Sequence, residues 1–269
     1  MTCTDRTAAI PSGRPCLLAT DEADMTALYR LAFLFLLILG WFIASQFIGR
    51  NIIPTPLATL QAGARLFSEG RLLEATGQSL AVFLSGFFLA TFVAIPLGAM
   101  MGAIRPFGKT LDVYVFALAA TPRVAFIPLV IVLLGLGIEA KAFIVFLGAV
   151  MPILINTYAG VLAADKELVE MARSTGAPQT RIFSHIVLPG ALPFVAVGLR
   201  IGATIGLINT VVAELYTAVT GLGGLLALYG NTFRMAEYFV IVICLAIIGV
   251  VMTEILRFIE SRLGRWKMS

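Results

Sequence analysis

Four charged or strongly polar side chains interrupt the apolar runs of this sequence, where such groups are rare and mark functional sites by default. The four residues are Arg123, Arg200, Asn209 and Glu214. An arginine that faces a path through the protein could attract an anion, and the other three could line the same path. Each could instead pair with a neighbouring helix or anchor near the end of its run. Path-lining and structural roles therefore both stay open.

The fifth apolar run carries three of these residues. Arg200 and Glu214 lie 14 residues apart, close to four turns of an α-helix, so one helix would present both on the same side. Arg200 stands near enough to one end of the run for its guanidinium to reach water, which favours a structural role. For Glu214 the two roles are equally consistent with the sequence.

Nucleotide binding is a second candidate chemistry, and it fails on spacing. The run Gly108-Lys109-Thr110 resembles the end of a phosphate-binding loop. That motif requires a glycine five positions before Gly108, where this chain has Ala103, and a preceding strand, where this chain has an apolar run. We interpret the run as a short basic turn, so any nucleotide must be bound by a partner.

Catalytic and metal-binding arrangements are not visible in the remaining residues. His185 is the one histidine, and it lacks ligand neighbours at metal-binding spacing, so we interpret it as a surface or interface residue. The cysteines Cys3, Cys16 and Cys244 form no pair at metal-ligand spacing. We find no Ser–His–Asp or HExxH pattern on a plausible span. We therefore expect no enzyme activity, metal or cofactor in this chain.

Composition points to a lipid bilayer as the solvent. The 269 residues are 59% hydrophobic and 13% charged, and the mean hydropathy is +0.98. Average soluble domains are about 25% charged. The apolar runs are continuous rather than alternating, and lipid demands that backbone groups bond within the chain, so we expect an all-α integral membrane protein. The 19 basic residues are dispersed, which argues against nucleic-acid binding.

Six runs are long enough to cross a bilayer, for which about 20 apolar residues suffice. A polar tail, 1–28, precedes them, and a polar, partly helical stretch separates the first two. The fifth run is longer than a bilayer needs, and the glycines at 220–225 indicate a break or a short extra helix after it. The predicted spans are 29–48, 79–103, 113–137, 142–163, 190–219 and 238–259.

Basic residues indicate the orientation of these spans, because cytoplasmic connections carry an excess of Lys and Arg. With the amino terminus inside, twelve basic residues fall on the inner face and five on the outer face. Both termini and the segment 165–189 are then cytoplasmic. The inner residues are Arg6, Arg14, Arg30, Arg105, Lys109, Lys166, Arg173, Arg181, Arg257, Arg262, Arg265 and Lys267; the outer ones are Arg50, Arg65, Arg71, Lys141 and Arg234.

The segment 165–189 is the long polar interruption between the fourth and fifth spans. Leu168, Met171 and Ala172 form an apolar stripe at helical spacing, and acids occupy the first turn. Gly176 is placed to end this helix in left-handed geometry. Pro178 can begin a second helix, and Pro189 is expected to separate that helix from the next span. The segment is thus predicted to be two short helices joined by a tight turn.

The pattern Glu170-x-Ala172-x3-Gly176-x9-Ile186-x-Leu188-Pro189 resembles the EAA loop of the permease subunits of bacterial binding-protein-dependent ABC importers. Met171 stands where the family has its first alanine. The resemblance implies that this segment, called the coupling segment below, docks on an ATP-binding subunit. It also implies that Glu170 contacts that subunit and that Gly176 makes the turn.

Looser resemblances extend over nearly the whole chain and point to the nitrate, sulfonate and taurine subgroup. They lie in IIPTP at 52–56, IPLGAMMG at 95–102, TPRVAFIPLVIVLLGLG at 121–137, and GLRIGATIG with VVAEL within 198–215. Relatives commonly carry a tryptophan shortly before the Ala-Glu pair, whereas this chain has Leu207 and Ile208 there.

The resemblance implies a type I importer fold in the bacterial inner membrane. It implies two ATP-binding subunits, a second permease copy and a soluble substrate-binding protein as partners, with ATP bound by a partner. The cargo would be a small anion such as a sulfonate, taurine or nitrate, although related systems carry other solutes, including thiamine precursors. The alternative is an autonomous secondary transporter driven by an ion gradient, which would need its own coupling-ion site.

Overall fold

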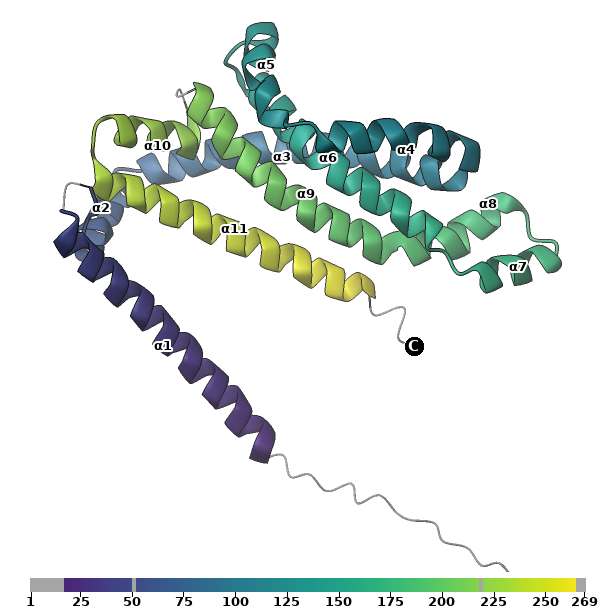
Figure 1. Cartoon of the computed structure of the whole chain (residues 1–269), viewed down its shortest axis with the longest axis horizontal. Coiled ribbons are helices and arrows are strands. Elements are labelled where there is room, and N and C mark those ends of the chain that lie inside the picture. Colours follow the sequence, from purple (N-terminus) through teal and green to yellow (C-terminus); the bar gives the residue numbers. More distant parts are fainter. Residues whose placement is uncertain (1–16, 50–51, 218–219, 265–269) are drawn as a thin grey trace, which may run out of the picture. The chain divides into compact units, whose positions relative to one another are not determined.

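The computed structural model describes residues 17–49, 52–217 and 220–264 (Figure 1). Within these ranges the regular elements are all helices, which confirms the all-α class. Among the described residues, five helices are long and apolar enough to cross a membrane, or six if one bent pair of helices is a single span. The chain divides into two compact units, Met1–Ala58 and Thr59–Ser269, and each is described by itself.

The first unit is built on one long helix, α1 (Leu17–Phe47). Its apolar part, Leu28–Phe47, is a helix long enough to cross a membrane and coincides closely with the first predicted span. The helix begins at Leu17, however, so the expectation of a loose tail over 1–28 is wrong from that residue onward. Glycine and proline, the residues that oppose a helix, are absent between Leu17 and Gly40. Residues 1–16 lie outside the described part of the chain.

The second unit is centred on three packed helices, α3 (Arg71–Ala103), α6 (Ile138–Leu162) and α9 (Leu188–Thr217). A fourth helix, α11 (Met235–Gly264), packs along α9 (Figure 1). Glycines allow close approach, as small residues do at helix interfaces in membranes. A Cβ on Gly86 of α3 would lie 2.6 Å from Val145 Cβ of α6, and one on Gly202 of α9 would lie 2.7 Å from Ile153 Cγ1.

The predicted third span, 113–137, is not one straight helix. The chain forms α4 (Arg105–Ala120), the short 3-10 helix η1 (Arg123–Phe126) and α5 (Ile127–Leu134). The direction of the chain changes by 81° between Arg105–Ala120 and Arg123–Leu134. Pro122 causes the break, because a residue that precedes proline avoids the helical region. Thr121 is accordingly extended, with φ −73° and ψ 132°.

The other predicted spans differ from the structure mainly at their ends. The second span begins at Arg71 rather than 79, and the fourth begins at Ile138 rather than 142, because the preceding residues continue both helices; Gly77 does not interrupt the first of them. The partly helical stretch before α3 is α2 (Pro56–Ser68). The predicted break after the fifth span is present, since α9 ends at Thr217 and α10 (Gly221–Asn231) follows.

The coupling segment contains α7 (Lys166–Ser174), α8 (Gln179–Ile182) and a π-helical turn, η2 (Phe183–Val187). Pro178 precedes α8 as its cap instead of occupying its first position. The prediction that Pro189 separates this second helix from the span is wrong: α8, η2 and α9 form one continuous helical stretch, Gln179–Thr217. The wide turn makes this possible, because the Leu188 N–H donates to the Phe183 carbonyl five residues back.

Candidate functional site

Local hydrogen bonds build the two-helix shape of the coupling segment. The Asp165 carboxylate accepts from the backbone N–H groups of Glu167 (2.9 Å) and Leu168 (3.4 Å), which caps the start of α7. Gly176 adopts φ +79° after the end of α7. The Gly176 N–H donates to the Arg173 carbonyl (2.9 Å) and the Ala177 N–H to the Ala172 carbonyl (3.0 Å). This pair of bonds is a Schellman motif, which satisfies the last carbonyls of a helix.

The two faces of α7 differ in surroundings. Leu168 and Met171 are 45% and 61% exposed, so the predicted apolar stripe lies mostly on the outside of the protein. Val169 and Glu170 line a cavity on the other face, toward the membrane-spanning helices. An apolar stripe on a helix outside the spans has neither lipid nor core to cover it, and such patches mark protein interfaces.

Glu214 is fully buried and caps α10 from a neighbouring helix. Its Oε2 accepts from the Gly223 N–H (2.9 Å), and its carboxylate accepts from the Ser79 hydroxyl of α3 (2.8 and 2.9 Å). The Ser79 Oγ also accepts from the Leu222 N–H (2.8 Å), and the Gln78 Oε1 accepts from the Gly221 N–H (2.9 Å). Three successive amides at the start of α10 are thereby satisfied by α3 and α9.

The Glu214 side chain also explains why glycines occupy this turn, because it leaves no room for larger residues. A Cβ on Gly223 would lie 2.6 Å from Glu214 Cβ, and one on Gly221 would collide with the carboxylate. Lys141 is 2% exposed nearby; it attracts Glu214 electrostatically, and its Nζ donates to the Thr220 hydroxyl (2.7 Å). We call this group of Gln78, Ser79, Lys141, Glu214 and Thr220 the α10 cap. Ser79, Lys141 and Glu214 are buried, which favours the structural role of Glu214.

Of the other predicted path residues, Arg123 and Asn209 lie against the same glycine, whereas Arg200 lies elsewhere. Arg200 pairs with Glu260 of α11 (3.2 Å), so it has a structural partner. Arg123, at the bend of the third span, donates to the carbonyls of Ala119 and Gly148 (3.2 Å each). Within the described residues it has no acidic partner within ion-pair distance. The Asn209 amide of α9 packs against Gly148 of α6, so Arg123 and Asn209 contact the same glycine. Arg200 and Glu214, in contrast, are not brought together.

Residues 94–265 match the protein family described as "Binding-protein-dependent transport system inner membrane component". The matched stretch is more than half of the chain and contains Arg123, the coupling segment and Glu214. The chain belongs to this family.

Named relatives of the permease include two proteins of Escherichia coli (strain K12). It is 34% identical over 229 residues to a permease protein named for aliphatic sulfonates transport, covering 84% of this chain and 87% of the relative. It is 29% identical over 237 residues to the permease protein of the taurine transport system, covering 86% of each. The family predicted from the coupling segment is confirmed.

A solved structure has the same fold. The inward-facing MetNI methionine ABC transporter matches with a TM-score of 0.61 and 20% identity, covering 69% of this chain and 93% of that chain. At this identity the likeness shows the fold alone, and it confirms the type I importer fold expected from the sequence.

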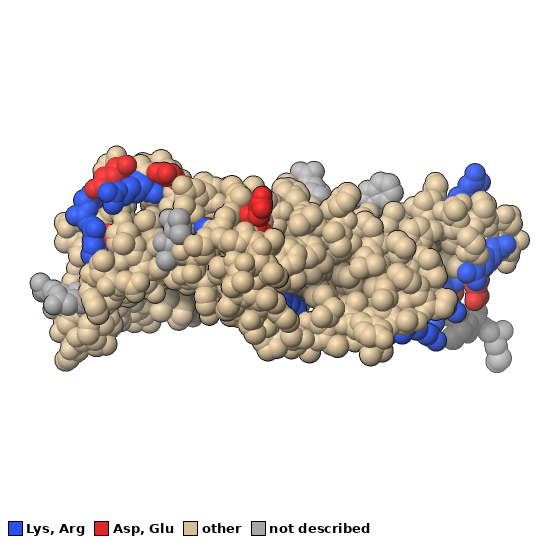
Figure 2. Space-filling model, turned by 90° about the horizontal axis from the view of Figure 1, so that it is seen from above, with Lys and Arg blue, Asp and Glu red and all other residues tan. Residues whose placement is uncertain are grey.

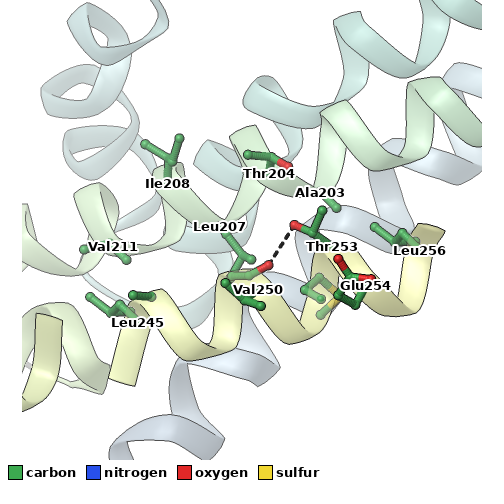
Figure 3. Close-up of a pocket in the computed structure, with 13 residues that line it drawn as sticks. Ala203, Thr204, Leu207, Ile208, Val211, Leu245, Val250, Thr253, Glu254 and Leu256 are labelled. Carbon is green, nitrogen blue, oxygen red and sulfur yellow. Dashed lines mark hydrogen bonds between the residues drawn. The ribbon is translucent and has the colours of Figure 1, made fainter. Parts of the chain in front are cut away.

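A largely apolar groove of about 430 Å³ runs between α9 and α11 of the permease (Figure 3). Leu207 and Val211 face it from α9, and Leu245 faces it from α11. The Thr253 hydroxyl donates to the Gly249 carbonyl of its own helix (2.7 Å), the bond drawn in Figure 3. The groove therefore presents few free polar groups to a charged solute.

Two features of the permease were not expected from its sequence. Lys141 was counted among the basic residues of the outer face, whereas it is buried in the α10 cap, and Ser79 was not singled out at all. Glu237 of α11 pairs with both Arg65 and Arg234, which ties α2 to α11. The glycine-rich break at 220–225 and the charge of Glu214 within an apolar run were the sequence signals that pointed toward the α10 cap.

Proposed function

We propose that this ABC importer permease carries a small anion, such as a sulfonate, taurine or nitrate, delivered by a soluble binding protein outside the membrane. The names of its relatives in sulfonate and taurine transport support this class of cargo. The Arg123 guanidinium supports it as well, since it donates to two backbone carbonyls and has no acidic partner among the described residues. Arg123 and Asn209 are the residues we propose for the path.

The coupling segment is the feature that supports the drive mechanism best. Two ATP-binding subunits would each dock on the exposed Leu168 and Met171 of one permease copy. Because α8, η2 and α9 are continuous, a displacement of the docked segment would pass directly into a membrane-spanning helix. Closure of the two ATP-binding subunits would then switch the spans between outward and inward access. The remaining residues of the EAA-type pattern belong to the same coupling segment: Glu170, Ala172, Ile186, Leu188 and Pro189.

A second permease copy is proposed to complete the path. The bent region of the third span exposes Leu129, Val132 and Leu133, at 54%, 81% and 71%. Helix association in membranes is driven by van der Waals packing, and these side chains are free to pack against a second set of helices. We propose a homodimer in the bacterial inner membrane with both termini in the cytoplasm.

Replacing Leu168 and Met171 together by serine is expected to weaken the docking of the ATP-binding subunit. Burying one such side chain contributes about 1.5–3 kcal/mol, so the loss of two should reduce affinity by at least about a hundredfold. Co-purification of the subunit with tagged permease measures the effect. Val169→Ser is the matched control, because Val169 faces the cavity on the same helix; equal losses in both variants would contradict docking through the exposed face.

Uptake into proteoliposomes tests the function as a whole. The permease would be reconstituted with its ATP-binding subunits and binding protein, with ATP enclosed at the cytoplasmic face. Labelled taurine should accumulate with ATP, and unlabelled alkanesulfonate or nitrate should compete. Accumulation driven by an ion gradient without ATP would instead support a secondary transporter. ATP-dependent uptake competed by thiamine precursors rather than anions would overturn the cargo alone.

A further inference from the structure

A cavity of about 460 Å³ lies between the coupling segment and the nearby ends of α3 and α6. Gly102 and Ala103 line it from α3, Val161 and Leu162 from α6, and Ile182 from α8. Ala103 and Leu162 are the last residues of two candidate membrane spans. The cavity therefore lies where the membrane interior gives way to the polar interface.

The charges around this cavity are predominantly positive. Arg105, Lys166 and Arg173 line it, and Glu170 is the acid among the lining residues. In the described part of the chain, none of these three cations forms an ion pair or a side-chain hydrogen bond. Figure 2 shows basic side chains gathered at the end of the second unit where α7 and α8 lie. Unpaired cations that converge on one cavity favour an anionic ligand.

The walls of the cavity are amphipathic. Val161, Leu162, Val169 and Phe183 supply apolar surface, whereas Gln179 and Thr180 add hydrogen-bonding groups to the basic rim. A free phosphate would use the cations and leave the apolar wall bare. A phospholipid would place its headgroup against the cations and its acyl chains along the apolar ends of the spans. Basic pockets between membrane helices on the cytoplasmic side bind anionic headgroups in this way.

We propose that this cavity is a binding site for an anionic phospholipid, with its phosphate held by Arg105, Lys166 and Arg173. The lipid would occupy the membrane-facing side of α7 and leave Leu168 and Met171 free on the other side. The site depends on the placement of the spans in a bilayer and not on the identity of the cargo.

Native mass spectrometry of the full-length permease in detergent tests the proposal, with dioleoylphosphatidylglycerol as the anionic probe and dioleoylphosphatidylcholine as the zwitterionic one. Phosphatidylglycerol should bind more tightly. Each cation near a membrane surface contributes affinity, so Arg105→Gln with Arg173→Gln should weaken binding by about fivefold per charge, or roughly 25-fold together. Lys109→Gln with Arg181→Gln removes the same charge from exposed positions outside the cavity lining and should leave the affinity unchanged.

Glu170→Gln provides a test that misfolding cannot imitate. Neutralising the Glu170 carboxylate removes a negative charge that repels the lipid phosphate, so phosphatidylglycerol should bind about fivefold more tightly. Equal affinities for the two lipids, equal losses in the cavity and control variants, or no gain in Glu170→Gln would overturn the proposal. Displacement of phosphatidylglycerol by millimolar inorganic phosphate would also overturn it, in favour of a soluble anion.

Discussion

Replacing Gly176 by valine is expected to remove most transport while the permease still reaches the membrane. Gly176 holds φ +79° between α7 and α8, in the left-handed region. That region costs an ordinary residue about 1–2 kcal/mol and is a genuine outlier for a β-branched one. The turn would open, and α7 would no longer present Leu168 and Met171 at a fixed angle to α8.

Gly176→Asn is the matched control, because asparagine tolerates left-handed geometry. A Cβ added at Gly176 would meet no neighbouring group within 4 Å, so the difference between the variants lies in the backbone conformation. We expect transport to fall by about tenfold or more for valine and to remain near the wild-type rate for asparagine. Both rates should be normalised to permease in the membrane. Equal transport in the two variants would show that the left-handed turn is not required for coupling.

Replacing Glu214 by leucine is expected to destabilise the permease itself. The change would remove the acceptor for the Gly223 N–H and the Ser79 hydroxyl and the negative charge near Lys141, all at buried positions. Unsatisfied buried hydrogen-bonding groups cost about 1–3 kcal/mol each, and the change leaves at least two of them. A loss of about 3 kcal/mol corresponds to a fall on the order of 10 °C in unfolding temperature.

Thermal unfolding of purified permease, followed by loss of the monodisperse species, measures this effect. Glu214→Gln keeps an acceptor oxygen for the Gly223 N–H and should lie between leucine and wild type. Glu139→Leu is the control, because Glu139 is an exposed carboxylate in the first turn of α6, where the change should be below about 1 kcal/mol. An unfolding temperature for Glu214→Leu equal to that for Glu139→Leu would contradict the α10 cap.

The coupling turn could be predicted because its determinants are local. Asp165 caps α7 through amides two and three residues away, and Gly176 ends the helix through bonds within the same turn. The positions of prolines predicted helix breaks less reliably. Pro122 breaks the third span at 81°, whereas the helix continues through Pro189 because a π-turn rearranges the preceding hydrogen bonds.

The sequence by itself determined the all-α membrane class, the approximate spans and the coupling segment, because lipid forces each apolar run to satisfy its own backbone within a few residues. Only the tertiary structure decided the roles of the isolated polar residues. Glu214 is bonded to Ser79, 135 residues away, and Arg123 reaches the Gly148 carbonyl of another helix. Such pairings depend on which helix faces meet, and that is settled by close packing at small residues such as Gly86 and Gly202.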